Sequence, residues 1–141
     1  MILLDTNVVS ELTRSHPDPK VDAFFRRRPP ETLFIAAVCE AEIRYGLARL
    51  PPGRHRNELA SRVIGFLAAA FNGRILAFDS AAAALYGEIR VSRSATGKPI
   101  GIADAMIAAT ARAYGVALAT RNVGDFAGCG ILVANPWSDD C

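Results

Sequence analysis

Ile2-Leu3-Leu4-Asp5-Thr6-Asn7 stands at the start of a 141-residue chain and indicates its architecture. Three consecutive apolar residues predict a short buried strand that ends at a carboxylate. Thr6 and Asn7 are capping residues, so we expect a helix to begin near Val8. A strand, an aspartate and a helix in this order are typical of a parallel α/β sheet.

The rest of the chain repeats this alternation of strands and helices. Periodic apolar residues predict helices over Lys20 to Arg28, Val38 to Leu50, Arg54 to Phe71, Ser80 to Ser94 and Ile102 to Tyr114. Short apolar runs predict strands over Leu33 to Ala36, Ile75 to Phe78, Val116 to Ala119 and Ile131 to Ala134. Because the strands are apolar throughout, we expect an α/β fold with a small, mostly parallel sheet of about five strands flanked by helices. We expect one domain over residues 1–141.

Composition excludes several classes of protein. Cys39, Cys129 and Cys141 are odd in number and contain no C-x-x-C pair, so we expect neither a disulfide framework nor a thiolate zinc site. The apolar stretches are shorter than the roughly 20 residues of a membrane span, and Met1 opens directly onto a strand. A cytoplasmic protein without a membrane anchor is therefore expected.

Four acidic residues, Asp5, Glu42, Asp104 and Asp125, are predicted to lie near strand ends or in apolar helices. A buried carboxylate is costly unless something pairs with it. Several carboxylates brought together resist joint ionisation unless a cation lies among them. Because all four would offer oxygen ligands, the pattern predicts a site for Mg²⁺ or Mn²⁺ rather than for zinc.

Asp5 and Glu42 also have ordinary explanations. Asp5 could be a helix cap, although Thr6 or Asn7 could take that role instead. Glu42 could be a surface glutamate. Glu40, two positions earlier, faces nearly the opposite way and is expected to pair with Arg44 one turn later.

The two later acids leave similar alternatives open. Asp104 lies in a nearly apolar helix, where the helix dipole offers about 0.3 to 1 kcal/mol against several kcal/mol of desolvation. It could also be a partly exposed aspartate of the first turn. Asp125 follows Asn122 and Gly124, so it could simply belong to a turn. His16 and His55 are isolated, and no H-E-x-x-H, phosphate-binding loop or G-x-G-x-x-G is present.

Four motifs in order along nearly the whole chain resemble those of the PIN-domain nucleases, in particular the VapC-type toxins of bacterial toxin–antitoxin pairs. They are Ile2-Leu3-Leu4-Asp5-Thr6-Asn7, Ala41-Glu42-Ile43-Arg44-Tyr45-Gly46, Ala103-Asp104-Ala105-Met106-Ile107-Ala108-Ala109, and Ala119-Thr120-Arg121-Asn122 leading to Asp125-Phe126. Each is weak alone, and the ordered set is specific. The resemblance implies a PIN-like α/β/α sandwich.

The resemblance also implies roles for individual residues. It assigns Asp5, Glu42, Asp104 and Asp125 as catalytic metal-site acids, with Thr6, Asn7, Thr120 and Asn122 as supporting polar residues. Some relatives carry the fourth acid at the position of Asn122, so the sequence leaves open whether Asp125 or Asn122 completes the site.

The activity implied is that of a metal-dependent endoribonuclease, the toxin of a VapBC-type pair, which cleaves RNA phosphodiesters by metal-activated water. The implied partners are RNA, a cognate VapB-type antitoxin that covers the active groove, a second copy in a homodimer, and operator DNA in a higher assembly with the antitoxin. Candidates for holding the RNA backbone are Arg26, Arg27, Arg28, Arg44, Arg49 and Arg121, each of which could equally be a solvated surface charge.

Two other functions remain open. Asn135-Pro136-Trp137 resembles a subgroup that includes a DNA-binding toxin–antitoxin complex, so the chain could be a weakly or non-catalytic partner in such a complex. Phosphoryl transfer through an aspartyl phosphate on Asp5 is disfavoured, because Asn7 stands where such enzymes carry a second aspartate. Leu12, Val21, Phe24 and Phe25 could form a dimer surface or belong to the core.

Overall fold

The computed structural model describes residues 1–139, and within them a five-stranded sheet runs β3-β2-β1-β4-β5 with every neighbouring pair parallel. The strands are β1 (Ile2–Leu4), β2 (Leu33–Ala36), β3 (Ile75–Leu76), β4 (Ala117–Ala119) and β5 (Val133–Ala134). The predicted small parallel sheet is confirmed. β3 and β5 are each two residues shorter than expected and β4 is one residue shorter, a usual error for sequence-based boundaries.

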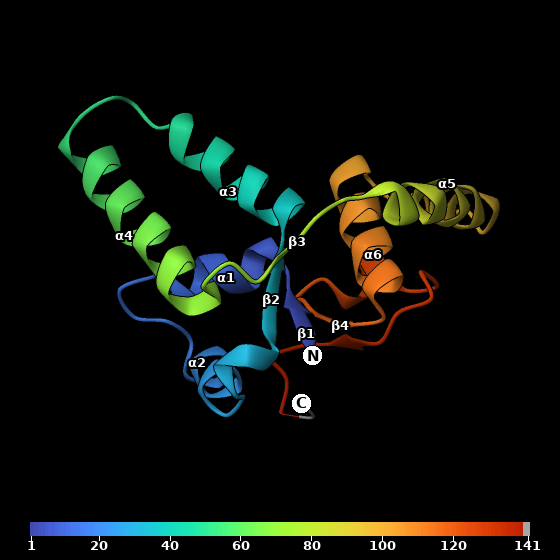
Figure 1. Ribbon diagram of the computed structural model, residues 1–141, viewed down its shortest axis with the longest axis horizontal. Helices are drawn as coiled ribbons and strands as arrows, with labels where there is room; N and C mark the ends of the chain where they lie inside the picture. Colours follow the sequence, from blue (N-terminus) through green and yellow to red (C-terminus); the bar gives the residue numbers. More distant parts are fainter. Residues whose placement is uncertain (140–141) are drawn as a thin grey trace.

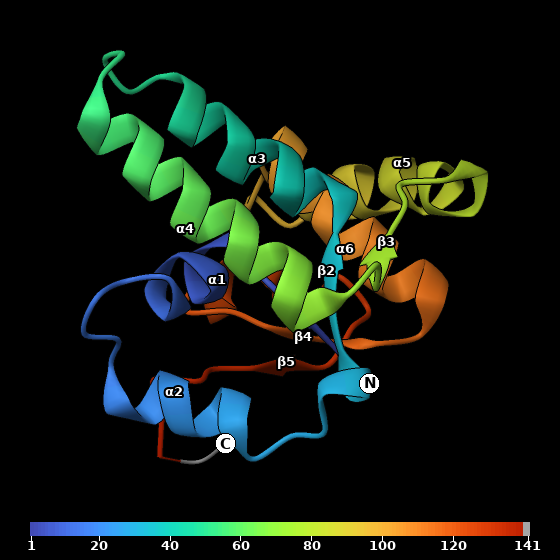
Figure 2. The same cartoon turned by 60° about the vertical axis from the view of Figure 1, so that its left-hand side comes forward.

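Helices flank this sheet on two sides (Figure 1). They are α1 (Thr6–Leu12), α2 (Pro19–Arg26), α3 (Ala37–Ala48), α4 (Arg54–Phe71), α5 (Ser80–Ala95) and α6 (Ile102–Tyr114), with 3₁₀ turns η1 (Pro30–Thr32) and η2 (Val123–Phe126). The α3–α4 pair projects to one side of β1 and β2, and α5 packs against α6 on the other. Figure 2 shows α3 and α4 running antiparallel, with the C-terminal segment ending near α2.

The start of α1 differs from the expectation. Asp5 is itself the N-cap, with extended backbone (φ −70°, ψ 160°), and its Oδ1 accepts the Thr6 backbone N–H at 2.8 Å. Thr6 and Asn7 therefore belong to the first turn, and their predicted capping role was wrong. Their side chains contact acidic residues instead: the Thr6 hydroxyl donates to Glu42, and the Asn7 amide donates to Asp5.

Strand register determines which loops meet at the carboxyl edge of the sheet. Leu4 of β1 lies opposite Ile35 of β2 on one side and Ala119 of β4 on the other. The ladder continues one residue further, because Asp5 N–H donates to the Ala119 carbonyl at 2.9 Å. Residues that follow β1 and β4 are therefore neighbours, as ligand-binding edges of open α/β sheets require.

The core lies on both faces of the sheet and includes the N-terminal apolar residues. Val21 and Phe24 are buried, and Leu12 and Phe25 pack against the core, so these four are core residues rather than an exposed patch. The buried face of α6 consists of Ala105, Ile107, Ala108, Ala109, Thr110 and Ala111. None of the helices in residues 1–139 combines the length and the apolar character needed to cross a membrane.

Candidate metal centre

Asp5 is the most buried of the predicted site acids, at 4% exposure. Its Oδ2 accepts the Thr120 hydroxyl at 2.7 Å and the Asn7 amide at 3.3 Å, while Oδ1 accepts the Thr6 N–H. Burial raises the pKa of Asp5, and the hydrogen bonds from Thr120 and Thr6 only partly oppose that rise. Asp5 is thus held in one orientation at the end of β1.

The predicted supporting residues form a network around Asp5. The Thr120 hydroxyl also accepts the Asn122 backbone N–H at 3.1 Å, and Asn7 Oδ1 accepts the Arg121 N–H at 3.3 Å. The Thr6 hydroxyl donates to Glu42 Oε1 at 2.7 Å. The segment after β4, the start of α1 and the middle of α3 are therefore tied together at the carboxyl edge.

Asp104 faces the same region from the first turn of α6 and is half buried. The pKa of Asp104 is raised to about 6, mainly by burial and further by the charges of Asp5, Asp125 and Glu42, while Arg93 opposes the rise. The four acids from distant segments are therefore brought within electrostatic range of one another.

Two of the acids are less buried than the sequence indicated. Glu42 and Asp125 are exposed, so the expectation of a buried carboxylate is wrong for this pair. It holds for Asp5, whereas Asp104 is partly exposed in the first turn of α6, the alternative that the sequence left open. Glu42 lies next to the buried Ile43 on α3, and its side chain extends to the rim of the site. Asp125 lies on η2, a turn on the surface.

Within the described part of the chain, Arg93 offsets this charge only in part. None of the four acids forms an ion pair there, and no three acidic, His or Cys side chains of residues 1–139 form a ready-made metal cluster. The charges of Glu42 and Asp125 raise the pKa of both Asp5 and Asp104, but no three of these side chains are placed closely enough in residues 1–139 to hold one ion. Carboxylate oxygens that would close around a hard cation fit Mg²⁺ or Mn²⁺.

A cavity of about 530 Å³ opens over these acids. It is lined by Asp5, Thr6, Asn7, Ser10, Glu11, Arg14, Glu42, Asp104, Arg121, Asn122 and Trp137. Asn122 lines this acidic cavity, whereas Asp125 does not. Asp125 therefore acts on the site through its charge, and the position of Asn122 faces the cavity itself.

The arginines proposed to hold RNA differ in where they lie relative to the acidic cavity. Arg121 lines the acidic cavity, as does Arg14, which the sequence did not single out. Arg26 pairs with Asp22, and Arg44 pairs with Glu40 as expected for residues one turn apart. Arg28 lies 3.5 Å over the Phe24 ring and Arg49 lies 5.5 Å over the Tyr45 ring, each away from the cavity.

Sequence reasoning missed Arg93, a buried arginine at 7% exposure on α5. Its Nη1 donates to the carbonyls of Asp125 and Ala127 at 2.6 and 2.9 Å, and its Nε donates to the Lys98 carbonyl at 2.7 Å. It thereby fixes η2, which carries Asp125, to the end of α5. Its position four residues after the buried Ile89 was the available signal, because both side chains share one helix face.

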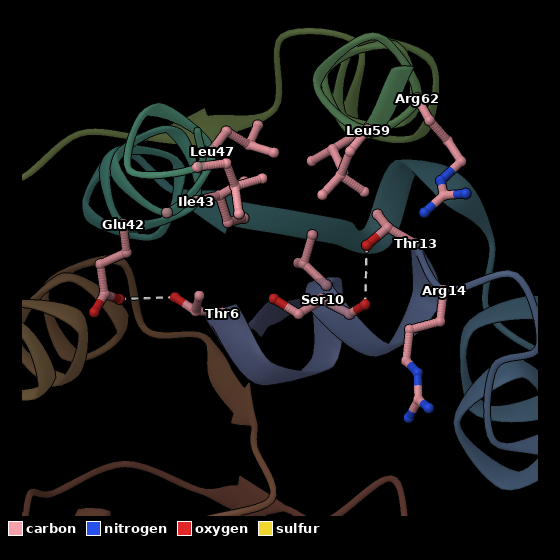
Figure 3. A pocket seen from close by; sticks show the side chains of 13 residues that line it. Thr6, Ser10, Thr13, Arg14, Glu42, Ile43, Leu47, Leu59 and Arg62 are labelled. Atoms are coloured by element: carbon pink, nitrogen blue, oxygen red, sulfur yellow. Dashed lines mark hydrogen bonds between the residues drawn. The ribbon is translucent and has the colours of Figure 1, made fainter. Parts of the chain in front are cut away.

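A second, more apolar groove adjoins the acidic cavity between α1, α3 and α4 (Figure 3). It encloses about 360 Å³. Glu42 lies at one end, Arg14 and Arg62 lie at the other, and Leu47 and Leu59 face the space between them. Thr6, Ser10, Arg14 and Glu42 line both spaces, so the two are continuous.

The parallel sheet and the acidic edge define a class of α/β proteins with a carboxylate site suited to a divalent cation. The chain belongs to the PIN-domain family, whose model matches residues 2–127. It is 42% identical to the VapC ribonuclease Y4jK of Sinorhizobium fredii, over 97% of this chain and 98% of that protein. It is also 42% identical to Toxin FitB of Neisseria gonorrhoeae, over 99% and 100%.

A solved structure of FitAB bound to an IR36 DNA fragment contains a chain with the same fold. Its TM-score to this protein is 0.90 at 41% identity, and the match covers 98% of this chain and 96% of that one. The predicted PIN-like sandwich is therefore confirmed along nearly the whole described length.

Proposed function

We propose that the chain is an endoribonuclease that depends on Mg²⁺ or Mn²⁺ and acts as the toxin of a VapBC-type toxin–antitoxin pair. The observation that supports this most is the convergence of Asp5, Glu42 and Asp104 on one cavity, where none of them forms an ion pair within residues 1–139. Burial and the neighbouring carboxylates raise the pKa of Asp104 there. Similarity to a VapC ribonuclease supports RNA as the substrate.

In this proposal Asp5 and Asp104 hold the main ion, while Glu42 and the charge of Asp125 complete its surroundings or favour a second ion. A divalent cation held there would lower the pKa of a bound water, the attacking group, and would offset negative charge on the phosphate oxygens. Thr120, Thr6 and Asn7 keep the Asp5 carboxylate in position through their hydrogen bonds.

Positive charge beside the acids would hold the substrate. Arg14 and Arg121 line the acidic cavity, so they would attract the phosphates that flank the scissile bond. No side-chain nucleophile is needed, because the attacking group is water.

The test is RNA cleavage by Asp5→Asn. This variant should lose at least about 100-fold in Mg²⁺- or Mn²⁺-dependent activity, because losing even a residue that orients a ligand costs 10- to 100-fold. Its circular dichroism should match that of the parent. Full activity in Asp5→Asn, or in excess chelator, would exclude the metal mechanism.

A matched pair on α3 controls for charge alone. Glu42→Gln should weaken Mn²⁺ binding measured by calorimetry, whereas Glu40→Gln should leave it unchanged, because Glu40 pairs with Arg44 away from the cavity. Equal losses in both variants would mean that bulk charge, not the site, attracts the ion.

We propose that the apolar groove receives a segment of the antitoxin. The floor formed by Leu47 and Leu59 fits apolar side chains, and Arg14 with Arg62 fits an acidic one. With the product of the neighbouring gene as partner, Arg62→Glu should weaken complex formation in pull-down and calorimetry. Arg56 lies on the same helix but does not line the groove, so Arg56→Glu should leave complex formation unchanged.

A DNA-binding complex without catalysis is the second candidate, favoured by the likeness to the chain in DNA-bound FitAB. RNA cleavage and promoter binding, each measured with and without the antitoxin, separate the two. Promoter binding by the complex, with no cleavage by the free chain in Mn²⁺, would select this alternative.

We also retain the proposals of one domain over residues 1–141 and of a homodimer. The N-terminal apolar residues are core and give the dimer no support. A monomer by analytical ultracentrifugation at micromolar concentration would contradict the homodimer, and a protease-resistant fragment much shorter than the chain would contradict the single domain.

A further inference from the structure

Arg121 and Trp137 form a stacked pair at the rim of the acidic cavity. The Arg121 guanidinium carbon lies 5.0 Å from the centre of the Trp137 ring, and both residues line the cavity. Trp137 is half buried and Arg121 is exposed. An aromatic ring combined with a guanidinium in a nucleic-acid cavity is a surface on which a base can stack.

The backbone of Arg121 is linked to the acids, and Trp137 packs partly against the core. The Arg121 backbone N–H donates to Asn7 Oδ1, and Asn7 in turn donates to Asp5. The Trp137 backbone N–H donates to Asn135 Oδ1 at 2.9 Å, and the buried Pro136 precedes it. The pair thus lies at the carboxyl edge, beside the cavity that the acids line.

Strand order gives the separation between the two positions. Asp5 follows β1, Arg121 follows β4, and Trp137 follows β5, which are successive strands in the sheet. Neighbouring strands lie about 4.8 Å apart, so the ends of β1 and β5 are separated by roughly 10 Å. The pair therefore lies beside Asp5 along this edge, in the direction of β5.

We propose that Trp137 and Arg121 form a stacking subsite for one unpaired base of the RNA beside the scissile phosphate. The inference rests on the proposed function, because it takes the acidic cavity to be the place of cleavage. Stacking uses the face that every base possesses, so the subsite selects an unstacked, single-stranded base rather than a particular sequence. The carboxylate site and the stacked pair would together hold the RNA on both sides of the scissile phosphodiester bond.

The test uses Trp137, the single tryptophan of the chain, as its own probe. Hexauridylate and hexaadenylate are titrated in EDTA, so that binding is measured without cleavage. Both should quench the tryptophan fluorescence, and an abasic ribose-phosphate hexamer of the same charge should bind more weakly without quenching. By fluorescence anisotropy of labelled hexamers, Trp137→Leu should lose about 5- to 100-fold in affinity for the intact hexamers, and Trp137→Phe should recover most of it.

A second arginine–aromatic pair supplies the control. Tyr45 is 65% exposed beneath Arg49 and lies outside the cavity, so Tyr45→Leu should bind hexamers as the parent does. Unchanged affinity in Trp137→Leu, or an abasic hexamer that binds as tightly as the intact ones, would overturn the subsite. Because these readings are made in chelator, they are independent of whether Asp5→Asn abolishes cleavage.

Discussion

Glu11, at the end of α1, and Asp104, at the start of α6, both line the acidic cavity, yet their charges are treated differently. Glu11 is 8% exposed, and its carboxylate accepts Arg14 Nη1 at 3.3 Å and the Asp18 N–H at 3.0 Å. Asp104 is less buried than Glu11, and its pKa is raised first by its own burial and then by three other carboxylates. The protein pairs the first charge with Arg14, whereas Arg93 offsets the second only in part and forms no ion pair with it.

This difference separates a structural acid from a ligand-binding one. A buried carboxylate with a cation and a backbone donor stabilises its surroundings, whereas a carboxylate among its own kind destabilises them until a cation binds. Substitutions at the two positions should therefore change stability in opposite directions.

The largest change in stability is expected at Arg93, the buried cation that acts on Asp104. Arg93→Met removes the donor shared by the carbonyls of Asp125, Ala127 and Lys98, so the free energy of unfolding should fall by about 3 kcal/mol. Urea unfolding measures this loss. Arg90→Met, an exposed neighbour on α5, should cost less than about 0.5 kcal/mol, and equal losses would contradict the assigned role.

Replacing the balanced acid should also destabilise the fold. Glu11→Ala leaves the Asp18 N–H without its acceptor and Arg14 without its partner, which should cost about 2 kcal/mol in urea unfolding. The exposed pair of Glu58 with Arg54 is the control, because Glu58→Ala should cost less than about 0.5 kcal/mol. A neutral Glu11→Ala would remove the distinction between the two acids.

The hydroxyl of Thr120 should matter for both stability and metal affinity. Thr120→Val keeps the shape but removes the donor to Asp5 and the acceptor of the Asn122 N–H, so we expect a loss of about 1 to 2 kcal/mol. Affinity for Mn²⁺ should fall about 10- to 100-fold by calorimetry. Thr110→Val, equally buried but bonded to Met106 within α6, should leave Mn²⁺ binding unchanged.

The smallest expected change has the opposite sign. The pKa of Asp104 is about 6 in the folded chain against 3.8 for an ordinary aspartate, so the folded state holds its proton more tightly between these values. The contribution of Asp104 to stability is therefore complete below about pH 3.8 and is lost as the pH rises through about 6. Asp104→Asn should lack that loss and be about 1 kcal/mol more stable than the parent at pH 7 without divalent metal, after allowance for solvent screening.

Urea unfolding across pH 4 to 7 in chelator tests this expectation. Parent and Asp104→Asn should diverge as the pH rises. A variant that is less stable than the parent at pH 7 would show that Asp104 resembles Glu11 after all.

Local patterns were enough to predict most of the fold. The apolar run Ile2–Leu4, the proline-terminated helices and Gly115 after α6 predicted strands and helices correctly, because those signals depend on neighbours in sequence. The capping of α1 was predicted wrongly, since Asp5, Thr6 and Asn7 can all cap and tertiary contacts decide between them. In the structure, the Asn7 side chain accepts a hydrogen bond from the Arg121 N–H, and the Thr6 hydroxyl donates one to Glu42.

The site was only partly predictable for the same reason. Asp5 and Asp104 stood out because apolar residues surround them in sequence, and that setting persists in the fold for Asp5. Arg93 was not predicted because two of the carbonyls it binds, those of Asp125 and Ala127, lie more than 30 residues away along the chain. The exposure of Glu42 and Asp125 likewise depends on how α3 and η2 are placed at the rim, which no local pattern reports.

A titration of the Asp104 carboxyl by carbon NMR, with and without saturating Mg²⁺, tests most directly whether these carboxylates bind a divalent cation. Without the metal, the pKa should lie near 6, raised by burial and by Asp5, Asp125 and Glu42. With Mg²⁺ the pKa should fall to the ordinary aspartate value or below, because the ion favours the ionised form. A pKa that stays near 6 in saturating Mg²⁺ would contradict a metal centre at these carboxylates.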